Sequence, residues 1–335
     1  MCRRKAVCRQ TSLRLFKVEP ALQVVLLLFP EPLLRYTKLE TQEFFVLTLR
    51  TLQPGDEVSL EKFLLQHSDT SMFLRSNWRA AGLLDQGARF QGTYIAAYTD
   101  ETIVAVAAHF WNGMIVVQAP VHLPEVVQAV VAQSGRAISG ISGPAAQVEA
   151  TKSILGLSNR LTQLDEAEIL FSLALRDLQI PEALVSAKVQ CRLPHPEELE
   201  LLGEWCVAYN VETLGRTDTP SLRPDCDRII ETRQATDMHW VLVAGDTPVS
   251  YSAFNASLPD IVQIGGVWTP PALRGKGYAK SVVAGSLLDA RSLLVKRAIL
   301  FTGDNNQAAQ AVYRGIGFLP TGQKYGLVLF EETQA

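Results

Sequence analysis

The sequence predicts a mixed α/β protein of the α+β type, with a mostly antiparallel sheet flanked by helices and with two tandem domains. The 335-residue chain is longer than an average domain, so either half can bury its own core. Hydrophobic residues form 47% of the chain and charged residues 19%, which is typical of globular proteins. Strand-like apolar runs alternate with helical stretches in both halves. We expect an extension over residues 1–42, a first domain over 43–183 and a second domain over 184–335.

The predicted extension is basic from Met1 to Lys17 and apolar from Ala21 to Phe29, which resembles the first two parts of a signal peptide. Pro30 and Pro32 follow this run, and no cleavage site of the small-x-small type is present. The run is also far shorter than the roughly 20 residues that span a bilayer. We therefore interpret residues 1–42 as poorly structured and expect no membrane partner, with export as the minority alternative.

The first domain begins with a strand-like stretch over residues 44–52, a turn at 54–56 and a helix at Val58–Gln66. Its middle part is rich in Tyr, Ile, Val and Thr, which favours a β-hairpin and a third strand, and helical character then returns. We expect these elements at Gly92–Ala97 and Ile103–Phe110 with a turn at 99–101, at Met114–Ala119, and at Glu125–Gln133.

A segment rich in Gly and Ser, Gly135–Pro144, allows two interpretations. It could be a phosphate-binding loop, or it could be a strand over Ala137–Ile141 bounded by turns, with Gly143 and Pro144 starting a helix. Neither G-x-G-x-x-G nor Walker spacing is present, so we favour the strand. The pattern is interrupted at residues 180–181, and we place the domain boundary near there.

The second domain is expected to start with a strand over Val185–Cys191, after which Pro194, His195 and Pro196 indicate a helix start. Helices, an antiparallel meander and a strand–helix crossover then follow. We expect helices at Glu198–Tyr209, Cys226–Arg233, Gly277–Leu294 and Asn306–Gly315, strands at His239–Ala244, Val249–Asn255, Ile261–Thr269 and Ala298–Thr302, a polar loop at Leu214–Pro224, and a hairpin turn at 245–246.

The charge balance restricts the partners. With 31 basic and 34 acidic residues the formal net charge is -3, so no excess positive field is available to hold a nucleic acid. A small polyphosphate is different, because backbone N–H groups can bind it without a basic surface. We therefore expect no nucleic acid partner, while a nucleotide-like cofactor remains possible on charge grounds.

The five cysteines do not form a metal-binding or disulfide pattern. They include no CxxC pair, and no histidine lies at zinc spacing from them. We interpret them as reduced thiols of a cytoplasmic protein and expect no metal. A metal half-site at Cys2 and Cys8 is the less favoured alternative.

The most informative stretch runs from Thr269 to Ala279. A strand ends at its start, two prolines follow, and the sequence Arg-Gly-Lys-Gly-Tyr-Ala then leads into a long helix. The first N–H groups of a helix have no intrahelical partner, so they can donate to a pyrophosphate while the helix dipole adds favourable potential. Gly275 and Gly277 allow the backbone to approach the oxygens, and Arg274 adds charge, as does Lys276. On its own, such a turn more often only connects two elements.

A second segment, residues 302–318, strengthens the case. It reads as a strand end, a helix capped by Asn306, and then Ala309 and Tyr313 one turn apart on the same helix face.

Together these residues resemble the GNAT superfamily of N-acetyltransferases. The loop pattern of that family is Arg or Gln, two residues, Gly, one residue, then Gly or Ala, and Arg274, Gly277 and Ala279 match it. Its later segment, Asn-x-x-Ala-x-x-Leu-Tyr followed by Gly-Phe, is matched by Asn306, Ala309, Tyr313, Gly317 and Phe318, with Val312 in place of Leu. The resemblance covers Val185 to the C-terminus, and it includes the variant Val-Trp-Thr-Pro-Pro of a branch in which a degenerate N-terminal copy often precedes the active domain.

The resemblance implies acetyl-CoA as cosubstrate. Backbone N–H groups from Leu273 to Ala279 would hold the pyrophosphate, the strand edge around residues 266–268 would bind the pantetheine arm, and Asn306 would help to position the coenzyme. Tyr313 would protonate the departing thiolate, for which a phenol is adequate; its plainer interpretation is a helix tyrosine that packs on the sheet. The implied coenzyme-binding residues are Val267, Trp268, Thr269, Arg274, Gly275, Lys276, Gly277, Tyr278, Ala279, Asn306 and Ala309.

The attacking amine also needs a base, because an ammonium has no lone pair. The family has no fixed position for this group. Glu212 lies beyond the first helix of the second domain, where the acceptor usually enters, and is the first candidate. Glu204, Asp218 and His239 follow, although each is individually more typical of a solvated or capping residue.

The first domain has a similar order of strands and helices, but no Arg or Gln with glycines at the required spacing. We interpret it as a diverged copy that has lost coenzyme binding and now shapes the acceptor pocket or the interdomain interface. The expected activity is therefore transfer of an acetyl group to a primary amine in a ternary complex. The main alternative is a non-catalytic sensor or scaffold that binds CoA or acyl-CoA. A hydrolase or metalloenzyme finds no support, because GxSxG, HExxH and clustered His and Cys ligands are missing from the sequence.

The acceptor itself is not encoded in a recognisable motif. An amino acid, a polyamine, an aminoglycoside-like drug, a peptide N-terminus and a protein lysine all remain open, as does the oligomeric state. The balanced charge favours a small molecule over a basic protein tail.

Overall fold

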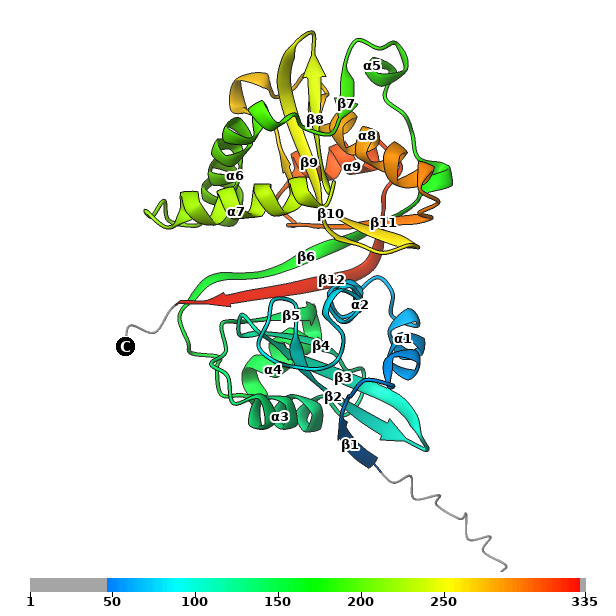
Figure 1. The fold of residues 1–335 in the computed structure, drawn as a ribbon, viewed down its shortest axis with the longest axis vertical. Coiled ribbons are helices and arrows are strands. Elements are labelled where there is room, and N and C mark those ends of the chain that lie inside the picture. Colours follow the sequence, from blue (N-terminus) through cyan, green and yellow to red (C-terminus); the bar gives the residue numbers. More distant parts are fainter. Residues whose placement is uncertain (1–46, 332–335) are drawn as a thin grey trace, which may run out of the picture. The chain divides into compact units, whose positions relative to one another are not determined.

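The computed structural model describes residues 47–331, so the predicted extension over 1–42, with Cys2 and Cys8, lies outside the described residues. The strands of the described part form one 12-stranded sheet with the order β1-β2-β3-β4-β5-β12-β6-β11-β10-β9-β8-β7 (Figure 1). Only β4–β5 and β10–β11 pair in parallel, and all other neighbours are antiparallel. The predicted mixed fold with a mostly antiparallel sheet is confirmed.

The first half has the order β-α-α-β-β-β-α-β-α-β. The predicted hairpin, the third strand and the helices around it are confirmed. Gly135–Pro144 contains a strand, as favoured, but it covers Gly140–Pro144 and not Ala137–Ile141, so Gly143 and Pro144 end the strand and the next helix begins only at Ala145. The helix α2 and the long strand β6 were not predicted. The elements are β1 (Leu47–Thr51), α1 (Glu57–Leu65), α2 (Met72–Ala81), β2 (Gly92–Thr99), β3 (Thr102–Phe110), β4 (Met114–Gln118), α3 (Leu123–Ser134), β5 (Gly140–Pro144), α4 (Ala145–Ile154) and β6 (Thr162–Ala174).

The second half repeats this order after the short helix α5 (Glu182–Val185). Its predicted meander, crossover and helices are confirmed, and β12 was not predicted. The elements are β7 (Gln190–Arg192), α6 (Leu199–Leu214), α7 (Leu222–Ala235), β8 (His239–Ala244), β9 (Thr247–Ser257), β10 (Ile261–Trp268), α8 (Tyr278–Ser292), β11 (Arg297–Thr302), α9 (Gln307–Arg314) and β12 (Leu319–Phe330).

Two predicted segments of the second half are wrong. The expected strand over Val185–Cys191 is a helix end, a turn and only then a strand, because Pro181 caps α5 and Ala187 has a φ of 52°, which no strand residue adopts. The expected loop over Leu214–Pro224 ends earlier than predicted, because α7 begins at Leu222. Pro224 lies in the first turn of α7, where its missing N–H costs nothing.

The two halves exchange their last strands. The strand β12, which follows α9, lies between β5 and β6 of the first half, with Tyr325 opposite Pro144. In return β6 lies between β12 and β11, with Leu170 opposite Phe301. Each half is therefore completed by a strand of the other, and the sheet has no break at the predicted boundary near residue 184; the division into two domains stays a prediction.

Alternation along the strands places helices on both faces of the second half. On β8, Trp240 and Leu242 pack in the same core cluster as α8, whereas Val241 and Val243 pack against α6 and α7. The first half follows the same plan: α1 and α2 pack with one face of its sheet, and α3 packs with the other. Such period-two alternation is what a sheet covered on both faces requires.

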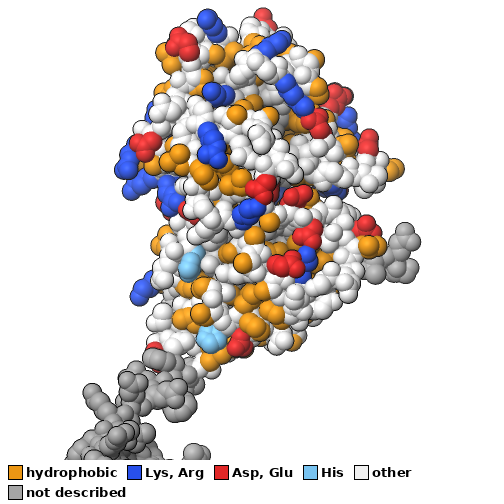
Figure 2. All heavy atoms as spheres, turned by 180° about the vertical axis from the view of Figure 1, so that it is seen from behind, with side chains coloured by type: hydrophobic (Ala, Val, Ile, Leu, Met, Phe, Trp, Pro, Cys, Tyr) orange, Lys and Arg blue, Asp and Glu red, His pale blue; other side chains and the backbone are white. Residues whose placement is uncertain are grey.

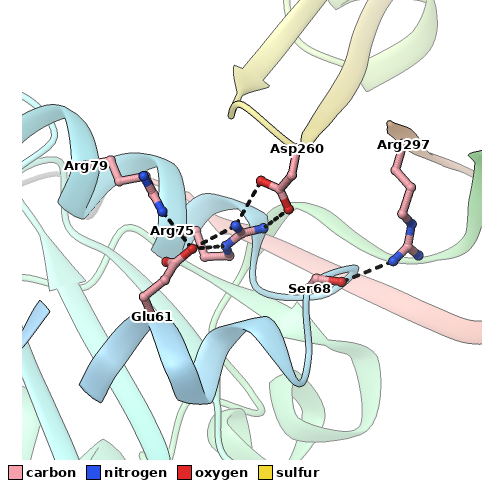
Figure 3. Close-up of polar contacts among 6 residues, drawn as sticks. All are labelled: Glu61, Ser68, Arg75, Arg79, Asp260 and Arg297. Carbon is pink, nitrogen blue, oxygen red and sulfur yellow. Dashed lines mark hydrogen bonds and ion pairs between the residues drawn. The ribbon is translucent and has the colours of Figure 1, made fainter. Parts of the chain in front are cut away.

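Polar and apolar contacts join the halves. Met72 of α2 packs in one cluster with Leu170 and with Ile261 and Ile299 of the second half. Beside it, Arg75 is 1% exposed and binds carboxylates of both halves (Figure 3). Its guanidinium donates to Glu61 Oε1 at 2.8 and 3.0 Å and to the two oxygens of Asp260, which lies between β9 and β10, at 3.0 and 3.2 Å.

Over residues 47–331, no helix is both long and apolar enough to cross a membrane. The face seen in Figure 2 carries Lys and Arg side chains interspersed with Asp and Glu, in keeping with the nearly balanced composition of the chain.

Candidate active site

The strands β10 and β11 part at their carboxyl ends. They pair in parallel over only three residues each, from Ile261 opposite Arg297 to Gln263 opposite Ile299. Beyond this point the pairing of β10 with β9 contains an irregularity between Gly265 and Trp268, so β10 bulges where the pantetheine arm is predicted to lie. Gln263 is buried at the parting, and its Oε1 has no hydrogen-bond partner among the described residues. Backbone groups of both strands are therefore left without a strand neighbour there.

The turn after β10 is anchored to the sheet by side chains. The Thr269 hydroxyl lies 2.8 Å from the Ser250 hydroxyl, and Arg274 Nε donates to the Thr269 carbonyl at 3.0 Å. The Arg274 guanidinium also lies 4.9 Å from the centre of the buried Trp268 ring. Trp268 and Thr269, which were predicted at the coenzyme site, thus hold the turn with their side chains, while Val267 packs in the core with α8.

The turn presents a row of unused backbone donors. Within the described part of the chain, none of the N–H groups of residues 275–280 donates a hydrogen bond, and the first helical bond of this end runs from Ser281 N to the Gly277 carbonyl. Gly275 and Gly277 have φ values of 78° and 80°, and no atom lies within 4 Å of a Cβ built on either. The N–H groups of Leu273 and Arg274 are used inside the turn itself. The unused donors therefore begin two residues later than the predicted row that starts at Leu273, and they meet the N-terminus of the 15-residue helix α8.

Asn306 and Tyr313 lie on the helix that follows β11. Asn306 Oδ1 accepts from Ala309 N at 3.0 Å, which confirms the predicted cap. The Tyr313 ring is buried and packs edge-on against Phe318. Tyr313 is therefore a core residue, as its plainer interpretation expects. Burial raises the pKa of Tyr313 above its ordinary value, and the charge of Glu168 adds to this. The phenol is therefore protonated at neutral pH, as a proton donor must be.

Each of the four predicted base candidates is exposed to solvent, held in an ion pair, or already hydrogen-bonded at all its polar atoms. Glu212 binds Arg274 at 2.6 Å, and Glu204 lies 3.6 Å from Arg223. Asp218 is exposed in the α6–α7 connection. His239 is fully buried and both ring nitrogens have polar partners, Gln234 and Tyr251. Burial lowers the pKa of His239 to about 4, so its imidazole is neutral.

One carboxylate of the site was missed by the sequence reasoning. Glu168, on β6, is half-buried, and among the described residues its side chain makes no hydrogen bond or ion pair; only its backbone is paired, opposite Tyr325 of β12. Burial raises its pKa to about 7, and the charge of Glu166 adds to the effect. Its own charge in turn raises the pKa of Tyr209 on α6 and of Tyr313 on α9. The only signal in the sequence is a Glu-Ala-Glu step at the start of an otherwise apolar run.

A large cavity of the described residues lies elsewhere. It has a volume of about 740 Å³ and is lined by the α1–α2 connection, the end of β4, the start of α4, and Arg297, Gln323 and Lys324. It contains none of the predicted site residues. It occupies the place in the first half that corresponds to the parting of β10 and β11 in the second half.

Among the residues that the structure describes, no group of three or more His, Cys, Asp or Glu side chains could hold a metal ion.

A family model described as acetyltransferase (GNAT) family matches residues 204–318. This range begins in α6 and ends after α9, so it includes the donor row of 275–280, Asn306 and Tyr313. Comparison with curated proteins finds no match.

Solved structures share the fold at low sequence identity. A Drosophila protein gives a TM-score of 0.60 at 10% identity, covering 84% of this chain and 98% of that chain. A GCN5-related N-acetyltransferase from Sphaerobacter thermophilus gives 0.53 at 13% identity, covering 86% and 98%. A tandem GNAT protein from the clavulanic acid biosynthesis pathway gives 0.50 at 11% identity, covering 86% and 100%. These likenesses concern the fold, and they extend over both halves of the chain.

Proposed function

Because residues 204–318 match the acetyltransferase (GNAT) family model, we propose that this protein transfers an acetyl group from acetyl-CoA to a primary amine of a small-molecule acceptor. The amine attacks the thioester directly in a ternary complex. The observation that carries the proposal is the row of unused N–H donors at residues 275–280, at the N-terminus of α8 and next to the parting of β10 and β11.

The coenzyme would bind along this path. The pyrophosphate would accept from the N–H groups of 275–280, where the two glycines leave open space and Lys276 adds charge. The pantetheine arm would pair with the bulged edge at Gly266 and Val267, and Asn306 and Ala309 would border it at the start of α9. Arg274 reaches this site as well, although its guanidinium is shared between the ring of Trp268 and the carboxylate of Glu212.

The chemistry is a single acyl transfer. The amine nitrogen forms a bond with the thioester carbon, the carbon–sulfur bond breaks, and the leaving thiolate takes a proton. Tyr313 supplies this proton, because its raised pKa keeps it protonated until negative charge develops on sulfur. A base must remove a proton from the amine nitrogen in the same process.

A protein that binds acyl-CoA without turnover is the second candidate. The ion pair between Glu212 and Arg274 favours it, since the first base candidate is then occupied. The phenol of Tyr313, which a binding protein would not need, favours the enzyme.

The first half is proposed to be a diverged copy without coenzyme binding. Its strand β4 is followed by Pro120 and by α3, which begins at Leu123 with Pro124 in its first turn. Proline has no N–H to donate, and no Arg-x-x-Gly-x-Gly or Gln-x-x-Gly-x-Gly pattern precedes the helix. The equivalent of the pyrophosphate turn is therefore lost.

Calorimetry with acetyl-CoA tests the coenzyme site. The variant Gly277→Glu places a carboxylate in the donor row, and we expect it to abolish the micromolar binding of the wild type. Gly135→Glu is the matched control, because Gly135 also has a positive φ and no atom within 4 Å of its Cβ, but lies in the first half. Absence of binding in the wild type, or equal binding in all three proteins, would refute the proposed site.

Turnover is tested with Tyr313→Phe. The variant keeps the ring that packs on Phe318, so the fold and the affinity for acetyl-CoA should be retained. We expect kcat to fall about 10²- to 10⁴-fold, the usual contribution of a positioned acid. If the wild type binds acetyl-CoA but acetylates no primary amine, the second candidate, a protein that binds acyl-CoA without turnover, would be favoured.

A further inference from the structure

The position of Glu168 follows from the exchange of strands. β6 runs beside β11 with Leu170 opposite Phe301 and Ile169 opposite Thr302, the last residue of β11. Glu168 is the next residue of β6, so it stands just beyond the end of β11. That end is one side of the parting between β10 and β11, where the thioester of the proposed coenzyme would lie. A strand of the first half thus carries a carboxylate to the site of the second half.

Among the described residues, the carboxylate of Glu168 differs from three other shielded carboxylates. Glu61, Asp85 and Glu198 have side chains only 14%, 14% and 11% exposed, and each is bound by an arginine at 2.6 to 2.8 Å. On β6 itself, Asp165 is bound by Lys152. Within residues 47–331 no cation binds Glu168, and its oxygens are not among the fully buried atoms without a partner, so they are accessible to solvent. A shielded carboxylate without a partner costs stability, which a purely structural residue would avoid.

The charge of Glu168 acts on two phenols that come from helices on opposite faces of the sheet. Tyr209 comes from α6 and Tyr313 from α9. The Tyr209 hydroxyl also lies in reach of the Gly266 amide, in the bulge of β10. The bulge of β10 and the end of β11, next to which Glu168 stands, are the two sides of the parting, and the charge of Glu168 also acts on the proposed acid Tyr313. Glu166 is the other charged group that faces Glu168, while the neighbouring Lys324 of β12 binds Asp304.

We propose that Glu168, supplied by the first half through β6, is the general base that takes the proton from the acceptor amine. The inference rests on the proposed acetyl transfer and replaces Glu212 as the base. As the carbon–nitrogen bond forms and the carbon–sulfur bond breaks, one N–H proton passes to the Glu168 carboxylate, directly or through a water molecule. Tyr313 gives its proton to the thiolate, and solvent returns both groups to their starting states. The first half is then part of the catalytic site.

The test compares the pH dependence of kcat/KM in four full-length proteins: wild type, Glu168→Gln, Glu166→Gln and Glu212→Gln. The probe is acetyl-CoA with the primary amine that the wild type acetylates fastest in a panel of amino acids, polyamines and aminoglycosides. For the wild type we expect kcat/KM to rise with pH through a midpoint near 7, where Glu168 ionises. Glu168→Gln should lose this midpoint and about 10²- to 10⁴-fold in rate, with unchanged calorimetric affinity for acetyl-CoA.

The two other variants are controls for charge and for the rival base. Glu166→Gln should keep the plateau rate and move the midpoint to lower pH, because the Glu166 charge opposes ionisation of Glu168. Glu212→Gln should keep the midpoint near 7. A wild-type profile in Glu168→Gln would overturn the inference while leaving the transferase in place, and loss of the midpoint in Glu212→Gln would return the base to Glu212. A wild type that binds acetyl-CoA but acetylates no amine of the panel would overturn the proposed function and this inference together.

Discussion

Shielded carboxylates of this protein occur in two settings. Glu61, Asp85 and Glu198 are each held by arginine, and the pKa of each carboxyl is below its ordinary value. For Glu61, burial raises the pKa, but the hydrogen bonds and charges of Arg75 and Arg79 outweigh it. Glu168 has no such partner, so burial dominates and its pKa rises to about 7. The difference separates carboxylates that stabilise the fold from one that costs stability.

The stability cost of Glu168 can be measured. Its pKa is raised in the folded state, from 4.5 to about 7. Below pH 4.5 the carboxyl is protonated in the folded and the unfolded state, so it costs no stability. As the pH rises through 7 this favourable state is lost, and the ionised carboxylate then destabilises the folded state. We therefore expect Glu168→Gln to raise the free energy of unfolding at pH 8 by up to about 3 kcal/mol, at 1.36 kcal/mol per pKa unit. Urea unfolding at pH 8 and at pH 4 would measure this gain, which should vanish at pH 4. A variant less stable than the wild type at pH 8 would show that the carboxylate has a stabilising partner.

The candidate site could be predicted in part. The turn at 269–279 and the cap at Asn306 are local patterns, because their geometry depends on neighbours within a few residues. Glu168 could not be found in this way. It lies in the half that has no coenzyme motif, and it reaches the site only through a pairing with a strand more than 100 residues later in the chain.

At the scale of elements, the predicted helices and strands with strong periodicity are the ones confirmed. The strand β8 has the predicted bounds, and α8 and β10 differ from prediction by one or two residues. The strand β6 was missed because its first residues, Thr162–Ala167, are largely polar and lack the alternation of a half-buried strand. Its pairing is set by the exchange with β12, and local propensity contains no information about a distant partner.

The helix α9 offers a test that separates a structural role from a coenzyme role. Asn306 caps this eight-residue helix through Ala309 N, and replacing such a cap by alanine usually costs about 1 kcal/mol. We expect Asn306→Ala to lose about that much free energy of unfolding and Asn306→Asp to retain it, because aspartate caps equally well. Chemical denaturation would give these values. If Asn306 also positions the coenzyme through its amide, Asn306→Asp should keep the stability but bind acetyl-CoA more weakly; equal affinity would limit the residue to capping.

At the scale of the whole molecule, the pairing of the described strands joins the two halves into one continuous sheet. The exchanged strands β6 and β12 pair with each other over most of their length and with one strand of each half. The apolar cluster around Met72 adds contacts outside the sheet. The bridge through Arg75 adds others (Figure 3). Separate unfolding of either half would expose both exchanged strands, so we expect a single transition.

The bridge at Arg75 is expected to contribute strongly to this cooperativity. Arg75→Met would leave Glu61 with Arg79 as its remaining partner and Asp260 without one at 45% exposure. We therefore expect a loss below the roughly 3–5 kcal/mol that an uncompensated buried charge costs, but larger than that of an exposed ion pair. The matched control is Arg50→Met, whose guanidinium is 45% exposed and whose ion pairs should contribute only about 0–1 kcal/mol. Urea titration of both variants checks the difference. Equal losses would mean that the bridge between the halves is not energetically important.

The exchange of strands also has a consequence for synthesis on the ribosome. The strand β5 ends at Pro144, but its neighbour β12 begins only at Leu319, so the whole second half must be translated before β5 is covered. Until then the edge of β5 is unpaired in the nascent first half, although most residues of this strand are buried in the folded protein. Such an unpaired edge is prone to pair with other chains. A protein built in this way depends on chaperones, or on slow initiation that keeps ribosomes apart, more than one whose domains close one after another.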